Sequence, residues 1–312
     1  MAARKKDKVE LRYYDIPQKE GVLALTGDEW IREYGEGIDN LHFHNLLEIG
    51  ICRFGTGDLV LDQRAERFGP DMISVIPRNF PHTTNSDPGT YGSWEYLFLD
   101  PGTLLREHFG ENEILQRRFL NLLGRDAFFG PVSQYRGLFS VVELILDEMR
   151  TKGAFYIEKV RGLLLSLLFE IARIAKKEDE DEPDVQLRTG VGPIQNALKY
   201  VEEHYADPIR IEELAKECHI SETHFRRLFS EYIDMTPVEY VNLVRVLRSC
   251  EALRSSNASM STVAQNCGFS TVSTFDRNFK QVLGVTPYQW KKDPKNYESR
   301  LLEVNISVRK GW

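Results

Sequence analysis

The sequence predicts an α+β protein with two folded parts: an N-terminal β-barrel followed by helices, and an all-α C-terminal domain. Three observations predict this class. Short apolar runs separated by glycine and proline turns fill residues 20–100, helical periodicity replaces them in residues 111–177, and two similar helical segments follow at an offset of about fifty residues. A chain of 312 residues is long enough to bury two such cores.

The first region has the sequence features of short strands. Runs such as LVLDQRAERF and DMISVIP are bounded by the turn signals RFGTGD, FGPD and IPRNFPH. Many short strands with such turns are typical of a small barrel or jelly roll, which we assign to residues 1–110.

The second region, residues 111–177, changes to a helical period. FYIEKVRGLLLSLLFEIARIAKK is apolar on more than one face, so this helix needs more than one packing partner. One face could cover the barrel and the other could meet a second copy, which predicts a dimerisation region; packing within one chain is the alternative. The preceding stretch, LFSVVELILDEMR, places five apolar residues on one helical face: Leu138, Val141, Val142, Ile145 and Met149.

Residues 178–193 are predicted to be a linker. The stretch KKEDEDEPDVQLRTGVGP has a run of acidic residues, then proline and glycine, and almost no apolar content. Limited proteolysis is expected to cut first between Lys176 and Gly192. For the tail, residues 293–312, the sequence predicts no function.

Charge and composition limit the function classes. The net charge of -7 argues against nucleic acid for the chain as a whole, but residues 190–292 hold 12 Lys and Arg against 12 Asp and Glu. A basic footprint there would have to come from placement on one face. There is no apolar run of eighteen residues, the basic N-terminus lacks the apolar stretch of a signal peptide, and the four cysteines have no metal-site spacing. We therefore expect a cytoplasmic protein with reduced thiols and no membrane partner.

The C-terminal third contains an internal repeat. IRIEELAKECHISETHFRRLFSEYIDMTPVEY is followed by ASMSTVAQNCGFSTVSTFDRNFKQVLGVTPYQW, and the offset changes by one residue at the start of the second helix of each unit. The matched pairs are Ala215 with Ala264 at an offset of 49, and Phe225 with Phe275, Phe229 with Phe279, and Thr236-Pro237 with Thr286-Pro287 at an offset of 50.

Each unit predicts a helix, a tight turn and a second helix. Gly268 suits a turn residue with positive φ, and His219 occupies that position in the first unit at some cost. Ser221 and Ser270 are expected N-caps. The phenylalanines face inward and the residues between them face outward, as in a helix-turn-helix motif that reads the DNA major groove. The segment PVEYVNLVRVLRSCEALRSS would join the two units rigidly.

These motifs resemble the AraC/XylS family of bacterial transcription regulators. The resemblance covers residues 194–292 and rests on two ordered helix-turn-helix units, with A-x-x-C-G-F-S, F-x-R-x-F-K and G-V-T-P in the second. It implies that outward positions of both recognition helices contact DNA. Val272 and Asp276 depart from the polar, base-reading side chains that such positions carry in related proteins. The implied DNA-contacting residues are Thr223, Arg226, Arg227, Val272, Ser273, Asp276 and Arg277.

The N-terminal region then resembles the cupin-type effector domain that often precedes such a DNA-binding domain. The stretch HFHNLLEIG gives His42-x-His44-x(3)-Glu48-x(6)-Gly55, the first cupin motif. The second motif is looser: PRNFPH supplies His82 but has Asn79 where metal-binding cupins usually have glycine.

Three interpretations of this cluster remain open: a pocket without metal, a regulatory metal site, and a catalytic metal site. Regulators with this resemblance commonly bind a small molecule, often a sugar, so the pocket without metal is favoured and no cofactor is expected. Imidazole and carboxylate side chains also suit Zn, Fe, Mn or Ni. The candidate effector-binding residues are His42, His44, Glu48, His82, Arg53, Trp94 and Tyr96, of which the histidines and Glu48 are the metal-ligand candidates.

The sequence therefore predicts a ligand-responsive transcription regulator with no catalytic residues. Its expected partners are promoter double-stranded DNA, a small-molecule effector such as a sugar or other metabolite, RNA polymerase, and a second copy in a homodimer. Activation is the expectation from the family. The alternative is a cupin metalloenzyme fused to a DNA-binding module.

Overall fold

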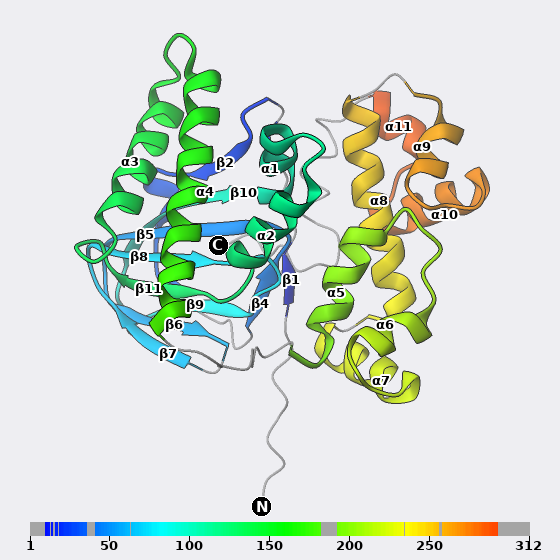
Figure 1. Ribbon diagram of the computed structural model, residues 1–312, viewed down its shortest axis with the longest axis horizontal. Coiled ribbons are helices and arrows are strands. Elements are labelled where there is room, and N and C mark those ends of the chain that lie inside the picture. The colour runs from blue at the N-terminus through cyan, green and yellow to red at the C-terminus, as the bar shows by residue number, and fades with distance from the viewer. Residues whose placement is uncertain are drawn as a thin grey trace, which may run out of the picture. The chain divides into compact units, whose positions relative to one another are not determined.

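The structure is a computed structural model that describes residues 10–12, 14, 16–17, 19–35, 41–62, 64–181, 192–233, 235–255 and 258–292. The chain forms two compact units, which meet in sequence between residues 190 and 191. The N-terminal unit is antiparallel sheet covered by helices, and from residue 192 to residue 292 the described part of the C-terminal unit contains helices and no strand (Figure 1). The predicted α+β class is confirmed.

Two antiparallel sheets make up the N-terminal unit. One runs β4-β9-β6-β7 and the other runs β11-β8-β5-β10-β2, with β3 beside β10. The bounds are β1 (Glu10–Arg12), β2 (Val22–Leu25), β3 (Ile31–Arg32), β4 (His42–His44), β5 (Leu47–Phe54), β6 (Gly57–Leu61), β7 (Arg64–Phe68), β8 (Met72–Ile76), β9 (His82–Ser86), β10 (Gly92–Leu99) and β11 (Phe128–Pro131), with a 3-10 turn η1 at Asp28–Trp30.

The second sheet has a core on each face, because successive side chains of a strand point to opposite sides. Ile49 and Ile51 of β5 and Leu97 of β10 pack with the helices. Cys52 of β5 and Tyr96 of β10 pack in a second core that also holds side chains of the other sheet. Every residue of β10 is buried, so this strand contributes side chains to both cores.

Four helices complete the unit: α1 (Pro101–Phe109), α2 (Glu113–Leu123), α3 (Arg136–Thr151) and α4 (Tyr156–Asp181). The predicted face of α3 is buried against the sheet, with Val141 partly buried. The region predicted to be helical also contains β11, which pairs with β8 and extends the sheet. Helix α4 continues through the first four residues of the predicted linker, and residues 182–191 of that linker lie outside the described residues. The tail, residues 293–312, also lies outside them.

The C-terminal unit consists of α5 (Gly192–His204), α6 (Ile211–Glu217), α7 (Glu222–Ile233), α8 (Pro237–Ser255), α9 (Met260–Asn266), α10 (Val272–Leu283) and α11 (Pro287–Lys292). Two helix-turn-helix units, α6–α7 and α9–α10, are joined by α8 (Figure 1). The four predicted inward phenylalanines are fully buried. None of the described helices is long and apolar enough to cross a membrane.

The tight turns confirm one prediction and correct another. His219 and Gly268 both have positive φ, at 56° and 81°. The first recognition helix begins as expected, with Ser221 Oγ accepting from the His224 amide at 3.4 Å. The second does not begin at Ser270: Thr271 is the N-cap and its Oγ1 accepts from the Thr274 amide at 3.1 Å. Ser270 is the extra residue that changes the repeat offset from 49 to 50, so it lies in the turn.

Candidate functional site

The histidine–glutamate cluster, defined as His42, His44, Glu48 and His82, forms between the two sheets. His42 and His44 lie on β4, Glu48 near the start of β5, and His82 at the start of β9. His42 and His82 face each other directly in the antiparallel β4–β9 pair. All four side chains are at most 2% exposed. The structure thus brings together four residues that the sequence places up to forty positions apart.

Glu48 is at the centre of this cluster. Its Oε2 atom lies 2.9 Å from His44 Nε2 and 3.5 Å from His82 Nε2. The ring centroids of His42 and His82 are 4.2 Å apart, and those of His44 and His82 are 4.9 Å apart. A single carboxylate oxygen is therefore shared by two imidazoles, with a third imidazole adjacent.

Backbone carbonyls fix the orientation of two of these rings. Nδ1 of His44 donates to the Leu46 carbonyl and Nδ1 of His82 donates to the Phe80 carbonyl, both at 2.8 Å. A carbonyl oxygen only accepts, so both Nδ1 atoms carry the hydrogen. The amide of Asn79 donates to the His44 carbonyl at 2.8 Å, and Asn79 has φ 60°. That left-handed conformation explains why asparagine can replace the glycine of the second motif.

The protonation states follow from this packing. Burial opposes ionisation of Glu48, but the imidazoles of His82 and His44 outweigh it and lower the pKa of Glu48 to about 2. Burial lowers the pKa of His44 below its usual value, against the opposing effect of Glu48. Glu48 is thus an anion, and the lowered pKa of His44 favours its neutral imidazole.

Two of the other predicted effector residues lie in the same core, and one does not. Trp94 and Tyr96 of β10 are 1% exposed, and their rings stack with centroids 5.9 Å apart. Arg53 instead lies on the opposite face of β5. Arg53 comes five positions after Glu48 on β5, and an odd difference reverses the face of a strand, so its side chain lies on the side of the helices, where it pairs with Glu143.

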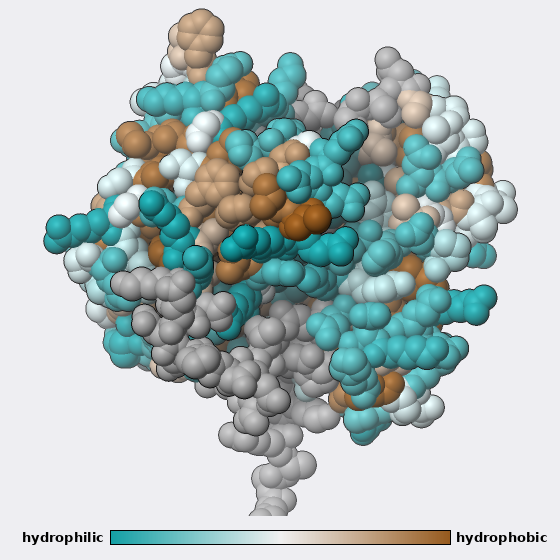
Figure 2. All heavy atoms as spheres, in the orientation of Figure 1, coloured by the Kyte–Doolittle hydropathy of each residue, from teal (hydrophilic) through white to brown (hydrophobic). Residues whose placement is uncertain are grey.

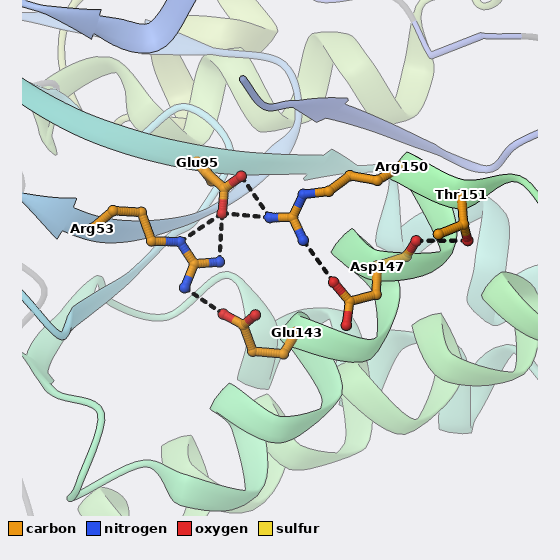
Figure 3. A network of polar contacts seen from close by, with 6 residues as sticks. All are labelled: Arg53, Glu95, Glu143, Asp147, Arg150 and Thr151. Carbon is orange, nitrogen blue, oxygen red and sulfur yellow. Dashed lines mark hydrogen bonds and ion pairs between the residues drawn. The ribbon is translucent and has the colours of Figure 1, made fainter. Parts of the chain in front are cut away.

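Arg53 belongs to a polar network that the sequence did not reveal (Figure 3). Its Nε donates to Glu95 Oε2 at 2.6 Å, and it pairs with Glu143 of α3 at 2.6 Å. Arg150 of α3 donates to both oxygens of Glu95 at 2.6 and 2.7 Å, and to Asp147 at 2.7 Å. Glu95 is 8% exposed, and a carboxylate this buried is costly unless it is paired. The guanidinium groups of Arg53 and Arg150 balance its charge. The network connects β5 and β10 to α3.

The predicted DNA-contacting surface is exposed on both recognition helices. On α7, Thr223, Arg226 and Arg227 are all exposed. Arg226 pairs with Glu222 at 2.7 Å and Arg227 lies 3.7 Å from Glu231, both one helical turn away. These ion pairs are solvent-exposed and weak, so either arginine can exchange its carboxylate for a phosphate or a base.

The second recognition helix presents the equivalent positions. Ser273, Asp276 and Arg277 of α10 are exposed, and Val272 is 37% exposed. Within the described part of the chain, Arg277 has no ion-pair partner. The two surfaces therefore differ: α7 offers two arginines and α10 offers one, beside a carboxylate.

Each of the two units matches the model of a known protein family. The AraC-like ligand binding domain matches residues 32–168, and a helix-turn-helix domain matches residues 214–293. The Msm operon regulatory protein of Streptococcus mutans is 22% identical over 83% of this chain and 86% of its own length. The regulatory protein PocR of Salmonella typhimurium is 32% identical over 32% of this chain and 33% of its own length.

Coverage of the curated relatives is uneven. The chain spans about a third of the length of the first two, PocR and the uncharacterised regulator YisR of Bacillus subtilis. Among solved structures, ToxT of Vibrio cholerae aligns over 87% of this chain at 14% identity and a TM-score of 0.39. The DNA-binding domain of AdpA aligns over 33% at 25% identity and a TM-score of 0.31. In having a match to an AraC-like ligand binding domain followed by a match to a helix-turn-helix domain, the chain is similar to transcription regulators of the AraC family.

Proposed function

We propose that this protein is a sequence-specific DNA-binding transcription regulator controlled by a ligand of its N-terminal unit. The observation that carries the proposal is the pair of helix-turn-helix units, each with an exposed outer face on its second helix and two buried phenylalanines behind it. A merely structural helix pair would not need two equivalent exposed faces at a constant offset.

The side chains of the recognition helices would make different kinds of contact with DNA, some to base edges and others to phosphate. Arg226 and Arg227 are adjacent, so their side chains leave α7 about 100° apart and cannot both reach one base. One reaches a base edge while the other contacts phosphate. On α10, Arg277 contributes the cation, Val272 can contact a thymine methyl, and Asp276 can accept from cytosine.

The cluster between the sheets is the proposed sensor. Its central carboxylate and imidazoles are polar groups in an otherwise apolar core, which is costly unless a ligand or a specific network uses them. All four side chains are at most 2% exposed, so any ligand would reach them only through a movement of the surrounding core.

A homodimer and contact with RNA polymerase complete the proposal. Large apolar side chains are exposed on the helical side of the N-terminal unit: Ile114 of α2 at 81%, Leu144 of α3 at 47%, and Phe155 between α3 and α4 at 81%. Figure 2 shows hydrophobic surface gathered over these helices. Such surface is suited to a second copy of the chain. Activation through RNA polymerase is the expectation from the family.

Binding to DNA fragments from upstream of the neighbouring operons tests the proposal. Fluorescence anisotropy across a salt series should show tighter binding to one fragment than to its scrambled sequence. Arg226→Ala should cost about 1–3 kcal/mol on the specific fragment if the arginine reads a guanine. An arginine that contacts only phosphate would instead weaken all sequences and reduce the salt slope by about one.

The control variant is Arg173→Ala, which removes a 77% exposed arginine from α4 in the other unit. It should bind specific DNA like wild type. Wild-type binding by Arg226→Ala, Arg227→Ala and Arg277→Ala alike would show that α7 and α10 are not the DNA-reading surface.

A further inference from the structure

The two helix-turn-helix units carry opposite net charges. Residues 208–242, which contain the first unit, hold 4 Lys and Arg against 7 Asp and Glu, a net charge of -3. Residues 258–292, the matching stretch at the repeat offset of 50, hold 4 Lys and Arg against 1 Asp and no Glu, a net charge of +3. DNA is a polyanion, so it attracts the second unit and repels the first.

The arginines of α7 are held by carboxylates of their own helix. Glu222 Oε1 accepts from Arg226 Nε at 2.8 Å and lies 2.7 Å from its Nη2. Arg227 lies 3.7 Å from Glu231 on the following turn. A phosphate can take either arginine only by displacing a carboxylate, which then stays beside the phosphate with its negative charge uncompensated. Contact of α7 with phosphate alone is therefore weakened.

The geometry of the Glu222–Arg226 pair still permits base recognition. The carboxylate binds the side edge of the guanidinium, formed by Nε and Nη2. The end edge, formed by Nη1 and the second N–H of Nη2, has the spacing that matches O6 and N7 of guanine. Arg226 can thus read a guanine while Glu222 remains paired and holds the guanidinium in position.

The cations of α10 have no such carboxylates. The two acidic positions of α7 are occupied in α10 by Val272 and Gln281. Arg277 and Lys280 are one helical turn apart, so they lie on the same side of the helix. Both are exposed, and neither has an ion-pair partner among the described residues. Both cations are therefore available to phosphate without displacing a carboxylate.

The α10 helix also has fewer side chains suited to reading bases. Asp276 occupies the position of Arg226, and Val272 can offer only an apolar contact. The α7 helix instead presents two arginines, and bidentate arginine–guanine pairs are the commonest specific contact to a base. The charge difference and the difference in base-reading capacity thus point in the same direction.

We propose that the second unit anchors the protein to the phosphate backbone through Arg277 and Lys280, whereas the first unit supplies the sequence preference and Glu222 suppresses its binding to incorrect sequences. This division rests on the proposed function as a sequence-specific DNA-binding regulator. On the correct sequence, Arg226 binds guanine and still compensates the charge of Glu222. On other sequences Arg226 can reach only phosphate, and the unpaired carboxylate opposes that contact.

The test measures the Kd of the full chain for its preferred DNA fragment and for the scrambled sequence, by fluorescence anisotropy at about 50–200 mM salt. Two quantities are compared between variants: the salt slope, and the ratio of the two Kd values. Neither depends on the folded fraction of the sample, so a partly unfolded variant still gives a result.

Lys280→Gln should weaken binding to both DNAs by the same factor, about 3–10-fold, and lower the salt slope by about 0.9, the value for one phosphate contact. The ratio of the two Kd values should stay that of wild type. The matched control is Lys199→Gln, which removes an exposed lysine from α5, outside both helix-turn-helix units, and should change neither quantity. A wild-type slope for Lys280→Gln, or a loss confined to the preferred fragment, would overturn the anchoring role.

Glu222→Gln should tighten binding to scrambled DNA by about 3–10-fold, because one unit charge beside a phosphate is removed. The Kd for the preferred fragment should stay within about 2-fold of wild type, since the charge of Glu222 is compensated there. The matched control is Glu203→Gln on α5, which makes the same change in net charge and should leave both Kd values unchanged.

Unchanged binding of Glu222→Gln to scrambled DNA would overturn the suppressing role. So would a lower ratio caused only by weaker binding to the preferred fragment, because Glu222 would then be a base-contacting residue. Equal binding of the unmodified chain to every fragment and its scrambled sequence would overturn the proposed function, while the salt slope of Lys280→Gln would still decide the anchoring role.

Discussion

Replacing Gly268 by alanine should destabilise the second helix-turn-helix unit by about 3 kcal/mol. The residue has φ 81°, and a Cβ atom would lie 2.4 Å from the Tyr205 carbonyl oxygen and 2.8 Å from Arg245 Nε. The left-handed conformation alone costs about 1–2 kcal/mol for a residue with a side chain. Alanine also lowers the conformational entropy of the unfolded chain, which offsets about 0.4–1 kcal/mol of that cost.

The overlap with the Tyr205 carbonyl oxygen accounts for the larger part of the expected loss of stability. Relief requires the carbonyl to move, but this oxygen accepts from Arg245 Nε at 2.8 Å. A hydrogen bond to a charged group contributes about 1.5–3 kcal/mol, and most of it would be lost. The sum of the conformational and hydrogen-bond effects is about 3 kcal/mol.

The first unit provides the matched control. His219 occupies the equivalent turn at φ 56° and already has a side chain there. His219→Ala keeps the same left-handed conformation without a new overlap, so its effect on stability should be below about 0.5 kcal/mol.

The assay is urea denaturation of the fragment 190–292, which contains a single tryptophan, the fully buried Trp290. Its fluorescence reports unfolding, and the free energy follows from linear extrapolation. A loss below 1 kcal/mol for Gly268→Ala, or equal losses for the two variants, would refute the argument from close approach.

Three further predictions concern single contacts. Thr271→Ala should destabilise the fragment by about 1 kcal/mol through loss of the N-cap, whereas Ser270→Ala should be neutral; the reverse order in urea denaturation would restore Ser270 as the cap. Glu95→Gln should lower the stability of the full chain by about 2 kcal/mol in thermal denaturation, since it leaves Arg53 and Arg150 partly buried without their shared carboxylate; a variant as stable as wild type would show that solvent replaces Glu95. His219→Gly should stabilise the first unit by about 0.5–1 kcal/mol by relieving the left-handed conformation, and destabilisation in the same assay would contradict this.

The repeat was readable from the sequence because its signals are local. Buried phenylalanines one helical turn apart and a turn residue with positive φ are fixed by neighbours in sequence, so both units were predicted with their inner faces. The N-cap at Thr271 was misplaced because two adjacent hydroxyl residues have the same capping chemistry, and only the backbone conformation decides between them. The repeat offset of 50 from Ser221 would have identified Thr271.

The proposed sensor, the histidine–glutamate cluster, could be predicted only in part. The spacing of His42, His44 and Glu48 was enough to predict that these three side chains act together. His82 was added to them only through the resemblance to the second cupin motif. Alternation along β5 could have shown that Arg53 lies on the other face of the strand from Glu48. Glu95 and its partners on α3 were not predictable, because pairing between a strand and a helix fifty residues later depends on tertiary packing.

Helix α8 has a consequence for the DNA that this protein can occupy. It is one continuous helix of 19 residues, about 28 Å long, between the two helix-turn-helix units. The spacing of the two recognition helices is thus built into a single chain. An operator for this protein should consist of two short blocks separated by a constant number of base pairs. Inserting one base pair between the blocks would rotate the second away by about a tenth of a turn, so operators should tolerate substitutions within that gap far better than insertions or deletions.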